Sequence, residues 1–484
     1  MKKRLIYILI GALSIAGCSS SDTNSEPVVM PSGGTSDLVT VGTISGFGSV
    51  FSQGIEFNTD SASVTMDGQP GNLSDLRIGM VVTIRATIND ETGAAVASQI
   101  NFSDDATGVI TSYNAATNSF FVLGRRVLVD SLTVFDNTTI DTLAVGNVVQ
   151  VSGQWRSQER IQATYVERVA NAYAAGMEME VKGEINGLNI GTQHFNIGTQ
   201  ACDYSAAMLE LGGADLANGL YVEVSSRSAL SNGDLVLDRI QARDRDRDRD
   251  QLCDSGCDFE LDGYVTSFVS ATEFEVDGSP VTTTAETVYV NGTVDTLALD
   301  AKLAVDGTSD AAGVLIADRI VFHMSSLIEV RADIESVDAI NAGVTVLGIV
   351  VTTDDFTMFR DHSDAEVLEF GLDDLVAGDR VEVRAYLDSN TVVATRLERD
   401  DPDDGVTLRA LVEAIARPSV TLLGVTVTSD QNTVFQNVAQ EIIDADEFFT
   451  LVDINSLVKA EGTYDGTSIL ADKLFLRNCQ DNCL

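Results

Sequence analysis

Residue types that commonly carry catalysis are scarce in this chain of 484 residues. Its three histidines, His194, His323 and His362, lie far apart and in none of the spacings, such as His-x-x-x-His, that bind a metal ion. No Gly-x-Ser-x-Gly motif of a serine nucleophile occurs. We therefore expect the histidines to be surface or strand residues, and we predict no catalytic residue, no metal site and no cofactor.

One acidic run, Asp400-Asp401-Pro402-Asp403-Asp404-Gly405, offers carboxylate oxygens of the kind that calcium prefers. The run lacks the alternating aspartates and the terminal glutamate of an EF-hand loop, and Pro402 falls where a ligand is needed. A turn between two domains is the favoured interpretation, with calcium binding as the alternative.

The six cysteines say more about the compartment than about catalysis. Cys253 and Cys257 are separated by three residues, as are Cys479 and Cys483, and both pairs lie in polar segments. Small disulfide loops are the preferred prediction, which would place the protein in an oxidising compartment. A zinc site is the alternative, but it needs four ligands from distant parts of the chain. Cys202 is left over, either as a buried free thiol or as a partner of another cysteine.

The N-terminus has the pattern of a secretory leader. Three basic residues, Lys2 to Arg4, precede an apolar run over residues 5–13 that is too short to span a bilayer. The segment Ile15-Ala16-Gly17-Cys18 resembles the lipobox of bacterial lipoproteins, which implies cleavage before Cys18 and acylation of this cysteine. Ser19 and Ser20 follow, which by the same resemblance favours the outer membrane. Several acyl chains would anchor the protein stably.

The composition is typical of folded domains with an acidic surface. Hydrophobic residues make up 44% of the chain, and the formal net charge is −43. Such a surface repels phosphate backbones and argues against nucleic acid as a partner. It would attract divalent cations or basic partners only loosely, and solubility is the simpler explanation of the charge.

A strand-rich motif recurs about six times after the leader. The copies open at Gly42, Gly108, Gly183, Gly263, Ala332 and Ala410. Spacings of this length exceed a solenoid coil and suit a string of small domains. We expect each domain to close its own apolar core and to leave acidic exteriors for contact with its surroundings.

Each copy contains the same strand signals in the same order. Apolar and β-branched residues alternate, as in Phe120-Phe121-Val122-Leu123-Gly124, and the glycine that ends the segment suits a tight hairpin with positive φ. A short Thr-x-Phe segment follows, for example at Thr133-Val134-Phe135.

The second half of each copy begins with a Leu-x-x-Gly segment, as at residues 76–79. We expect this segment to form one helical turn that plugs one end of a barrel. Copies four and six lack the glycine, and the sequence places Lys302 and Ser456 there. The final strand has an Ala-x-x-Ile pattern, as in residues 97–100, whose spacing of three predicts a β-bulge. Copy three has Leu237 in place of the alanine. With five or six strands in about 65 residues, a small curved barrel is the natural way to remove sheet edges.

These motifs together resemble the repeats of bacterial lipoproteins known as domain of unknown function 5666. The likeness extends over nearly all of residues 41–477, is clearest in copies one and two and is weakest in copy three. It implies tandem OB-like barrels, closed or partly open, and no established activity. OB-type barrels often bind oligonucleotides or oligosaccharides, but the fold does not fix the function.

The predicted fold class is all-β, with about six such barrels behind a disordered, lipidated stalk. The predicted limits are 1–17 for the signal peptide, 18–40 for the stalk, 41–104, 106–168, 181–243, 260–324, 330–400 and 408–477 for barrels 1 to 6, 244–259 for a linker and 478–484 for a cysteine-containing tail.

The linker holds an unusual alternating run, Arg243-Asp244-Arg245-Asp246-Arg247-Asp248-Arg249-Asp250. Its charges nearly cancel, so it is not a polybasic membrane-binding segment. A solvated linker is the favoured interpretation. A strand extension whose arginine face contacts an acidic neighbour is the alternative.

We therefore predict a non-enzymatic, lipid-anchored envelope protein that acts as a multi-domain binding or structural module for an unidentified protein or glycan. A polysaccharide-binding or processing protein is one alternative, although Trp155 is the single tryptophan available for stacking on sugars. Calcium-dependent surface assembly is another.

Overall fold

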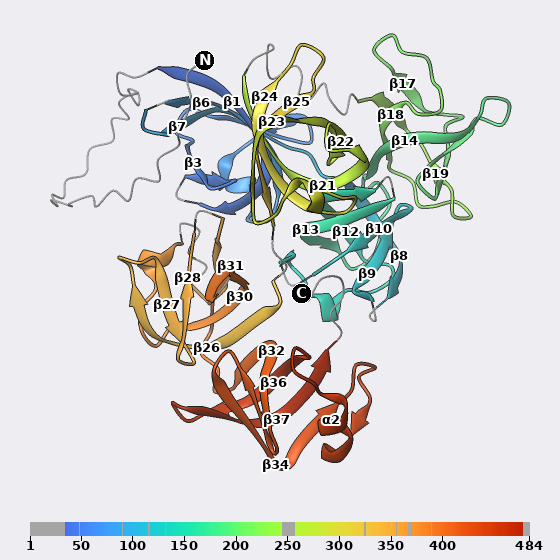
Figure 1. Ribbon diagram of the computed structural model, residues 1–484. Helices are drawn as coiled ribbons and strands as arrows, with labels where there is room; N and C mark the ends of the chain where they lie inside the picture. Colours follow the sequence, from blue (N-terminus) through green and yellow to red (C-terminus); the bar gives the residue numbers. More distant parts are fainter. Residues whose placement is uncertain are drawn as a thin grey trace.

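The computed structural model describes residues 34–477 apart from positions 48, 90, 115–116, 131, 158, 244–256, 324–325, 355, 366, 368–369 and 389. The leader, Cys18, the Arg-Asp run after Arg243, Cys253, Cys479 and Cys483 therefore lie outside the described residues, and the predictions made for them stay predictions. Nearly all elements of the described chain are strands (Figure 1). Among the described residues, no helix is long and apolar enough to cross a bilayer.

The first three barrels follow one another from Thr35 to Ala242. Barrel 1 contains β1 (Thr35–Gly46), β2 (Val50–Ser52), β3 (Ile55–Asn58), β4 (Ser63–Met66), β5 (Gln69–Gly71), η1 (Leu73–Asp75), β6 (Val81–Asn89) and β7 (Ala95–Phe102). Barrel 2 contains β8 (Ala106–Asn114), β9 (Ser119–Val122), β10 (Arg125–Leu128), β11 (Val134–Asp136), η3 (Ile140–Thr142), β12 (Val148–Ser157) and β13 (Arg160–Ala170). Barrel 3 contains β14 (Met179–Asn189), β15 (His194–Ile197), β16 (Gln200–Asp203), β17 (Met208–Glu210), β18 (Tyr221–Ser226), β19 (Leu235–Val236) and β20 (Arg239–Ala242).

The last three barrels extend from Asp258 to Arg477. Barrel 4 contains β21 (Asp258–Ser270), β22 (Glu273–Val276), β23 (Ser279–Val290), η4 (Val294–Thr296), β24 (Lys302–Ser309) and β25 (Leu315–Phe322). Barrel 5 contains β26 (Ile328–Asp338), β27 (Gly343–Val346), β28 (Ile349–Thr352), β29 (Met358–Asp361), η5 (Leu372–Asp374), β30 (Arg380–Asp388) and β31 (Thr391–Asp400). Barrel 6 contains β32 (Val406–Ala416), β33 (Ser419–Leu422), β34 (Val425–Gln436), β35 (Ile442–Ile443), α2 (Ala445–Leu451), β36 (Leu457–Tyr464) and β37 (Ser468–Arg477).

The barrels share one ring of strand pairings. In barrel 1, β1 pairs antiparallel with β2 and β2 with β3; β3 then pairs in parallel with β7, and β6 joins β7 back to β1. Each of barrels 2 to 6 contains the corresponding parallel pair. In barrel 3 the last strand of the ring is divided into β19 and β20. A closed five-stranded ring of this kind is OB-like, so the predicted fold class is confirmed.

The boundary of the predicted stalk needs correction. Residues 35–40, which were assigned to the stalk, belong to β1. Leu38 and Val39 in this segment are buried, because β6 pairs along one edge of β1 and β21 of barrel 4 pairs along the other. The sequence of one copy alone does not show that a distant barrel covers its first strand.

The hairpin after the second strand of each barrel has the conformation that the sequence predicts. Gly124, Gly348 and Gly424 all have positive φ, between 72° and 76°. The residue before each glycine also has positive φ, as at Leu123 with 44°, so both central positions of the turn are left-handed. Two-residue hairpins of type I′ require this backbone. Leu123 adopts it with a fully buried side chain, so packing offsets the cost of an unfavourable backbone.

The predicted helical turn exists, but it lies just before the Leu-x-x-Gly segment. In four barrels a 3-10 turn ends at a buried leucine that lies in the barrel core, namely Leu76, Leu143, Leu297 and Leu375. The glycine follows with positive φ, and in barrels 4 and 6 this position is occupied by Asp300 and Asn455, with φ of 71° and 68°. The assignment of Lys302 and Ser456 to this position is therefore wrong. Asp and Asn tolerate left-handed backbone better than most residues, which explains the substitution.

The predicted β-bulge of the closing strand is present in five barrels. In each of these barrels the last strand pairs antiparallel with the strand before it, as β7 does with β6. The register of this pair shifts by one residue within the Ala-x-x-Ile segment of the last strand, which we call the closing strand. The residue opposite each bulge is small, namely Ala86, Gly153, Gly307, Ala385 and Gly462. A Cβ atom on any of the three glycines would overlap a carbonyl oxygen of the closing strand.

The threonine of the Thr-x-Phe segment stabilises the same bulge. Its Oγ1 donates to the carbonyl oxygen of the bulge alanine at 2.7–2.8 Å, in the pairs Thr133–Ala163, Thr357–Ala394 and Thr433–Ala471. Thr287 makes the same bond to Ala317 in barrel 4. Two motifs some thirty or more residues apart thus form one structural device, because a bulge leaves a carbonyl that the ladder does not satisfy.

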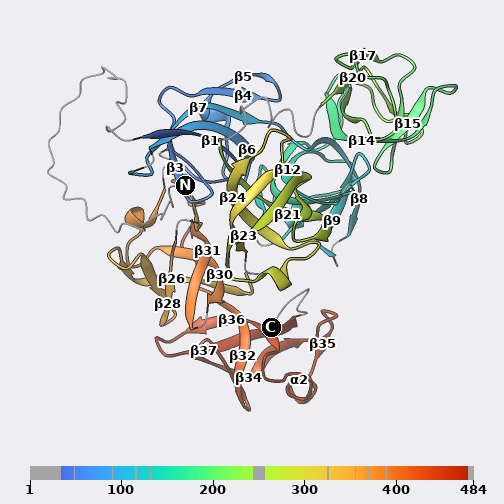
Figure 2. The ribbon, with the colours of Figure 1, turned by 45° about the horizontal axis from the view of Figure 1, so that its top comes forward.

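The sheets continue from one barrel into another. β8 pairs antiparallel with β14, which joins barrels 2 and 3, and β26 pairs with β32, which joins barrels 5 and 6. β1 pairs in parallel with β21, so the sheet of barrel 1 continues into barrel 4, whereas barrel 2 contacts barrel 1 through side chains such as Val134 and Tyr165. Figures 1 and 2 show barrel 4 (yellow) between barrels 1 (blue) and 2 (teal), with barrel 3 (green) and barrel 6 (red) at separate ends.

The apolar cores are also shared within these pairs. One continuous cluster of buried side chains extends through barrels 5 and 6, and another extends through barrels 2 and 3. The expectation that every unit closes its own separate core is therefore wrong. Pairing of the first strands places apolar residues of both barrels opposite each other, as in Val330 and Leu408, so their interiors merge.

Candidate functional site

Buried polar contacts join barrel 2 to barrel 4. Gln154 on β12 donates from Nε2 to Asp262 Oδ2 at 2.5 Å, and the next backbone N–H, of Trp155, donates to Asp277 Oδ1 at 2.7 Å. All four residues are at most 6% exposed. Burial opposes the charge of Asp262, but Lys302, His323 and Gln154 outweigh burial and hold the pKa of Asp262 well below its usual range. These contacts position the two barrels relative to each other.

The following residue, Arg156, completes the junction. Its Nε donates to Asp300 Oδ1 at 2.6 Å, and its Nη2 contacts the other oxygen of the same carboxylate. The guanidinium also lies over the Tyr264 ring, 4.8 Å from the centroid. A bidentate pair that is stacked on an aromatic ring is a strong and specific contact. Asp300 is the residue that takes the left-handed glycine position in barrel 4, so one substitution serves both the turn and the junction.

A second charged cluster lies at the seam between barrels 5 and 6. Glu329 on β26 accepts hydrogen bonds from Arg384 Nη1 at 2.6 Å and from Lys459 Nζ at 3.1 Å, and Arg409 Nη1 lies 3.3 Å away. The Glu329 side chain is 6% exposed. Burial opposes its charge, but Arg384, Lys459 and Arg409 overcome burial and lower the pKa of Glu329 to about 2. Two of the three cations belong to barrel 6, so this carboxylate joins the barrels.

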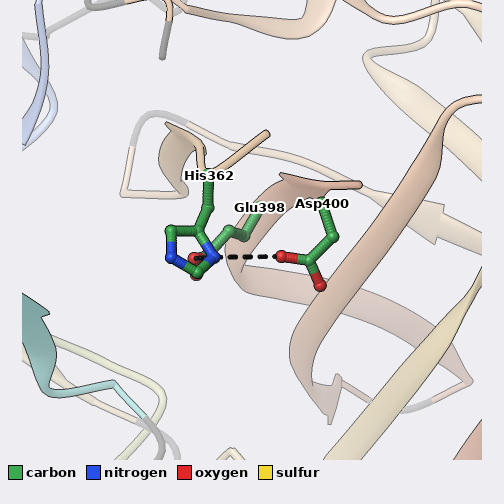
Figure 3. Close-up of side chains that lie close together, drawn as sticks. All are labelled: His362, Glu398 and Asp400. Atoms are coloured by element: carbon green, nitrogen blue, oxygen red, sulfur yellow. Dashed lines mark hydrogen bonds and ion pairs between the residues drawn. The ribbon is translucent and has the colours of Figure 1, made fainter. Parts of the chain in front are cut away.

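His362, Glu398 and Asp400 form a third cluster on barrel 5 (Figure 3). One ligand atom of each lies within 4.8 Å of the others, and His362 Nδ1 lies 3.2 Å from Asp400 Oδ1. Arg360 also pairs with Glu398 at 3.2 Å, and Arg331 pairs with Asp400 at 3.3 Å. The hydrogen bond to Asp400 raises the pKa of His362. Because the arginines already neutralise both carboxylates, we interpret this cluster as an ion-pair network.

Asp67, Asp104 and Glu180 form a fourth cluster at the junction of barrels 1, 2 and 3. Asp67 lies in the turn between β4 and β5, Asp104 in the link between β7 and β8, and Glu180 near the start of β14. One carboxylate oxygen of each lies within 4.8 Å of the other two. Asp104 is 3% exposed, whereas Asp67 and Glu180 are half-buried.

The hydrogen bonds of this cluster are incomplete. Asp104 Oδ2 accepts from Thr107 Oγ1 and from Gln150 Nε2, the latter at 3.2 Å. Within the described part of the chain, neither Asp104 Oδ1 nor Glu180 Oε1 accepts a hydrogen bond, although both atoms are buried. Lys182 Nζ is 4.0 Å from Asp104 Oδ1. Two carboxyl groups of one cluster thus each keep a buried oxygen that accepts no hydrogen bond from the described residues, an arrangement that is rare in folded proteins.

The electrostatics of the cluster follow from this geometry. Burial raises the pKa of Asp104 to about 6, with a further contribution from Asp67 that Lys182 partly opposes. Burial, with the charges of Asp104 and Glu223, raises the pKa of Glu180 to about 8. Burial and the neighbouring carboxylates thus outweigh Lys182 and disfavour the charged form of both groups.

The structure does not bring the three histidines together. His194 Nδ1 lies 2.6 Å from the Thr192 carbonyl oxygen at one end of barrel 3, and His323 Nε2 lies 2.9 Å from Asp262 Oδ1 in barrel 4. His362 belongs to the ion-pair network on barrel 5.

The acidic run 400–405 connects barrel 5 to barrel 6. Arg331 lies 3.3 Å from Asp400 Oδ2 and 3.8 Å from Asp403 Oδ2, and Arg380 donates to the Gly405 carbonyl oxygen. These contacts agree with the interpretation of the run as a turn between domains.

Of the cysteines, Cys202 and Cys257 lie among the described residues. Cys202 is a buried free thiol in the core of barrel 3, and burial raises its pKa to about 12. A thiol in this environment is unreactive. Cys257 is also buried, within the apolar core of barrel 4, while its predicted partner Cys253 lies outside the described residues.

These observations define a class of protein built from six OB-like barrels that are joined in pairs by continuous sheets and by buried ion pairs. A family profile described as "Domain of unknown function (DUF5666)" matches residues 107–167, 262–321, 332–398 and 409–474. The chain belongs to this family. The matches fall on barrels 2, 4, 5 and 6, so the expectation that copy one carries one of the clearest likenesses is not confirmed.

Comparison with other proteins adds no activity. A solved structure titled "drosophila Unr CSD456" is 13% identical to the chain, and the alignment covers 35% of this chain and 79% of that chain with a TM-score of 0.13. A likeness at this level carries no argument about fold or function. No curated protein matches the chain.

Reasoning from the sequence missed the fourth cluster for a simple reason. Asp67 lies in a turn of copy one, Asp104 in the link between copies one and two, and Glu180 in the first strand of barrel 3, and each carboxylate resembles an ordinary turn, link or strand residue. The one signal in the sequence is a pair of adjacent aspartates, Asp104 and Asp105, in the short link between copies one and two.

Proposed function

We propose that the protein is a non-enzymatic, lipid-anchored protein of the bacterial cell envelope whose barrels act together as a binding or structural module. The observation that carries this proposal is the use of buried polar groups to join one barrel to another. Gln154 and Asp262 join barrels 2 and 4, and Glu329 joins barrels 5 and 6. Breaking such a contact leaves a buried charge uncompensated, so the contacts favour one fixed arrangement of the barrels.

A fixed arrangement suits a protein that presents several surfaces at set distances. The net charge of −43 repels phosphate backbones, so nucleic acid is not the proposed partner. A protein or a glycan of the envelope fits better. Screening the purified chain on a glycan array distinguishes the two, because specific glycan binding would support the polysaccharide-binding alternative and overturn binding to proteins alone.

The lipid anchor is supported by the basic leader, the short apolar run and Cys18. Metabolic labelling with a palmitate analogue, followed by membrane fractionation, tests this part of the proposal. We expect Cys18→Ala to lose both the label and membrane attachment. Cys202→Ala, which removes a buried thiol, is the control and should keep both. An unlabelled wild-type chain would contradict the anchor.

The fixed arrangement is tested by small-angle X-ray scattering of the chain without its leader. We expect wild-type scattering that one conformation of the described residues can fit. Arg156→Ala should increase the radius of gyration by loosening barrel 2 from barrel 4. Arg227→Ala is the control, because the side chain of Arg227 is 64% exposed and pairs with Glu178 at the surface. Wild-type scattering that requires independently moving barrels would overturn the proposal.

A further inference from the structure

We infer that Asp67, Asp104 and Glu180 form a binding site for one divalent cation, with Ca²⁺ favoured, at the junction of barrels 1, 2 and 3. The site would connect three domains through one ion. This inference does not rest on the proposed function, because it depends on side-chain geometry and not on location or partner.

The first argument is distance. Oxygen ligands of Ca²⁺ lie 2.3–2.6 Å from the ion, so two ligands of one ion are separated by at most about 5 Å. The three oxygens of this cluster all lie within 4.8 Å of one another. Mg²⁺ binds at 2.0–2.1 Å and keeps several waters, which requires a tighter and more regular set of ligands. Carboxylate oxygens from three separate elements suit the more adaptable calcium ion.

The second argument is the pair of buried oxygens that accept no hydrogen bond within the described residues, Asp104 Oδ1 and Glu180 Oε1. The Asp104 side chain is only 4% exposed. A buried carboxylate oxygen without a donor or a cation costs free energy, and two ionised carboxylates in one cluster also repel each other. A cation bound between them removes both costs.

The third argument is the orientation of the nearest positive group. Lys182 Nζ donates to Ser103 Oγ at 2.5 Å and to the carbonyl oxygen of Asp104. Its distance of 4.0 Å from Asp104 Oδ1 is too long for a hydrogen bond. Among the described residues, the one ammonium group beside the cluster thus donates its hydrogen bonds elsewhere and to none of the three carboxyl groups.

The cluster on barrel 5 provides a contrast within the same chain. There, arginines already contact both Glu398 and Asp400, so no carboxylate is left without a positive partner. The two clusters have a similar spacing of ligand atoms, but because only one of them is neutralised by arginines, we expect only the other to bind a cation. Asp400→Asn is accordingly a matched control for the cation site.

The test is calorimetric titration of Ca²⁺ into the chain without its leader, after treatment with EDTA and in about 150 mM NaCl to screen loose binding to the acidic surface. We expect one saturable site with a dissociation constant on the order of 0.1–1 mM, the range of extracellular calcium modules. Glu180→Gln and Asp67→Asn should each weaken binding at least tenfold. Asp400→Asn should leave the affinity unchanged.

Hydrogen exchange gives a second readout. Ca²⁺ should slow exchange in peptides that contain residues 103–107 and 178–182 of the wild type, and it should not do so in Glu180→Gln. If Glu180→Gln does not fold, Asp67→Asn in the half-buried turn replaces it in the test.

Three results would each overturn the inference. One is the absence of a saturable site in the wild type. The second is unchanged affinity in both Glu180→Gln and Asp67→Asn. The third result is that Glu180→Gln without Ca²⁺ is as stable as the wild type with Ca²⁺, and that Ca²⁺ changes the melting temperature of neither protein. The carboxyl groups would then share a proton in place of a cation, and the cation site would be refuted. None of these three results would affect the Cys18 labelling test.

Discussion

Replacement of Glu329 by glutamine tests whether buried ion pairs hold barrels 5 and 6 together. The substitution keeps the size and shape of the side chain but removes the anion between Arg384, Arg409 and Lys459. Three cations then remain near one another, and each of their side chains is only 12–22% exposed. Breaking a buried pair in this way typically costs about 3–5 kcal/mol, whereas an exposed pair contributes about 0–1 kcal/mol.

The pKa of Glu329 gives an independent value for the free energy by which this ion pair stabilises the folded state. A fall from the ordinary value of 4.5 to about 2 corresponds to about 3 kcal/mol of stabilisation by the charged form, at about 1.4 kcal/mol per pH unit. The two approaches agree, so we expect Glu329→Gln to destabilise the seam by about 3 kcal/mol at pH 7. This corresponds to a roughly 100-fold larger equilibrium constant for opening of the seam, and to amide exchange that is faster by the same factor when closing is fast.

Hydrogen exchange of amides in β26 and β32, which pair across the seam, is the appropriate assay because it reports this junction separately from the other barrels. Asp472→Asn, at an exposed position on β37, is the control and should change protection by less than about 0.5 kcal/mol. If Glu329→Gln lowers the protection free energy by less than about 1 kcal/mol, or by no more than the control does, the Glu329 carboxylate does not stabilise the seam.

The same variant carries a pH prediction. Because the folded pKa of Glu329 is depressed, its contribution is fully present above the ordinary pKa of 4.5 and is lost as pH falls through about 2. The difference in protection between wild type and Glu329→Gln, measured at equal pH, should therefore be constant from pH 7 to about 5 and approach zero near pH 2. A difference that stays the same at pH 2 would contradict the electrostatic explanation.

Two further substitutions test the bulge of the closing strand. Thr433→Val removes the donor to the Ala471 carbonyl oxygen while keeping the side-chain volume, and chemical denaturation should show a loss of about 1–2 kcal/mol; no loss would mean that the bond is dispensable. Gly307→Ala places a methyl group against the Ile316 carbonyl oxygen and should lower stability by about 1–3 kcal/mol, whereas Gly371→Ala, in open space with φ of −149°, should change it by less than about 0.5 kcal/mol; equal effects would show that the space opposite the bulge is not limiting.

The strand pattern, the six copies, the hairpin glycines and the bulge could all be predicted from the sequence, because each depends on residues close together in the chain. Alternation of apolar residues sets which face is buried, and a glycine such as Gly124 marks a left-handed position wherever it occurs. At Asp300 a different residue takes the left-handed position, and the residue type does not mark it. Only the positive φ of Asp300 shows that it corresponds to the glycine of the other barrels.

The candidate site could not be predicted in the same way. The carboxylates of Asp67 and Glu180 lie far apart in sequence and meet only after the barrels have formed and packed. No local pattern marks such pairs, since each residue is unremarkable within its own copy.

The sequence by itself determined the building block, because hydrophobic alternation and turn residues act over a few positions and require no partner. The tertiary structure decided how the blocks are joined: which first strands pair, why barrel 1 lies against barrel 4, and where carboxylates gather. Free strand edges and buried charges both need partners from elsewhere in the molecule, and the identity of those partners depends on the packing of whole domains.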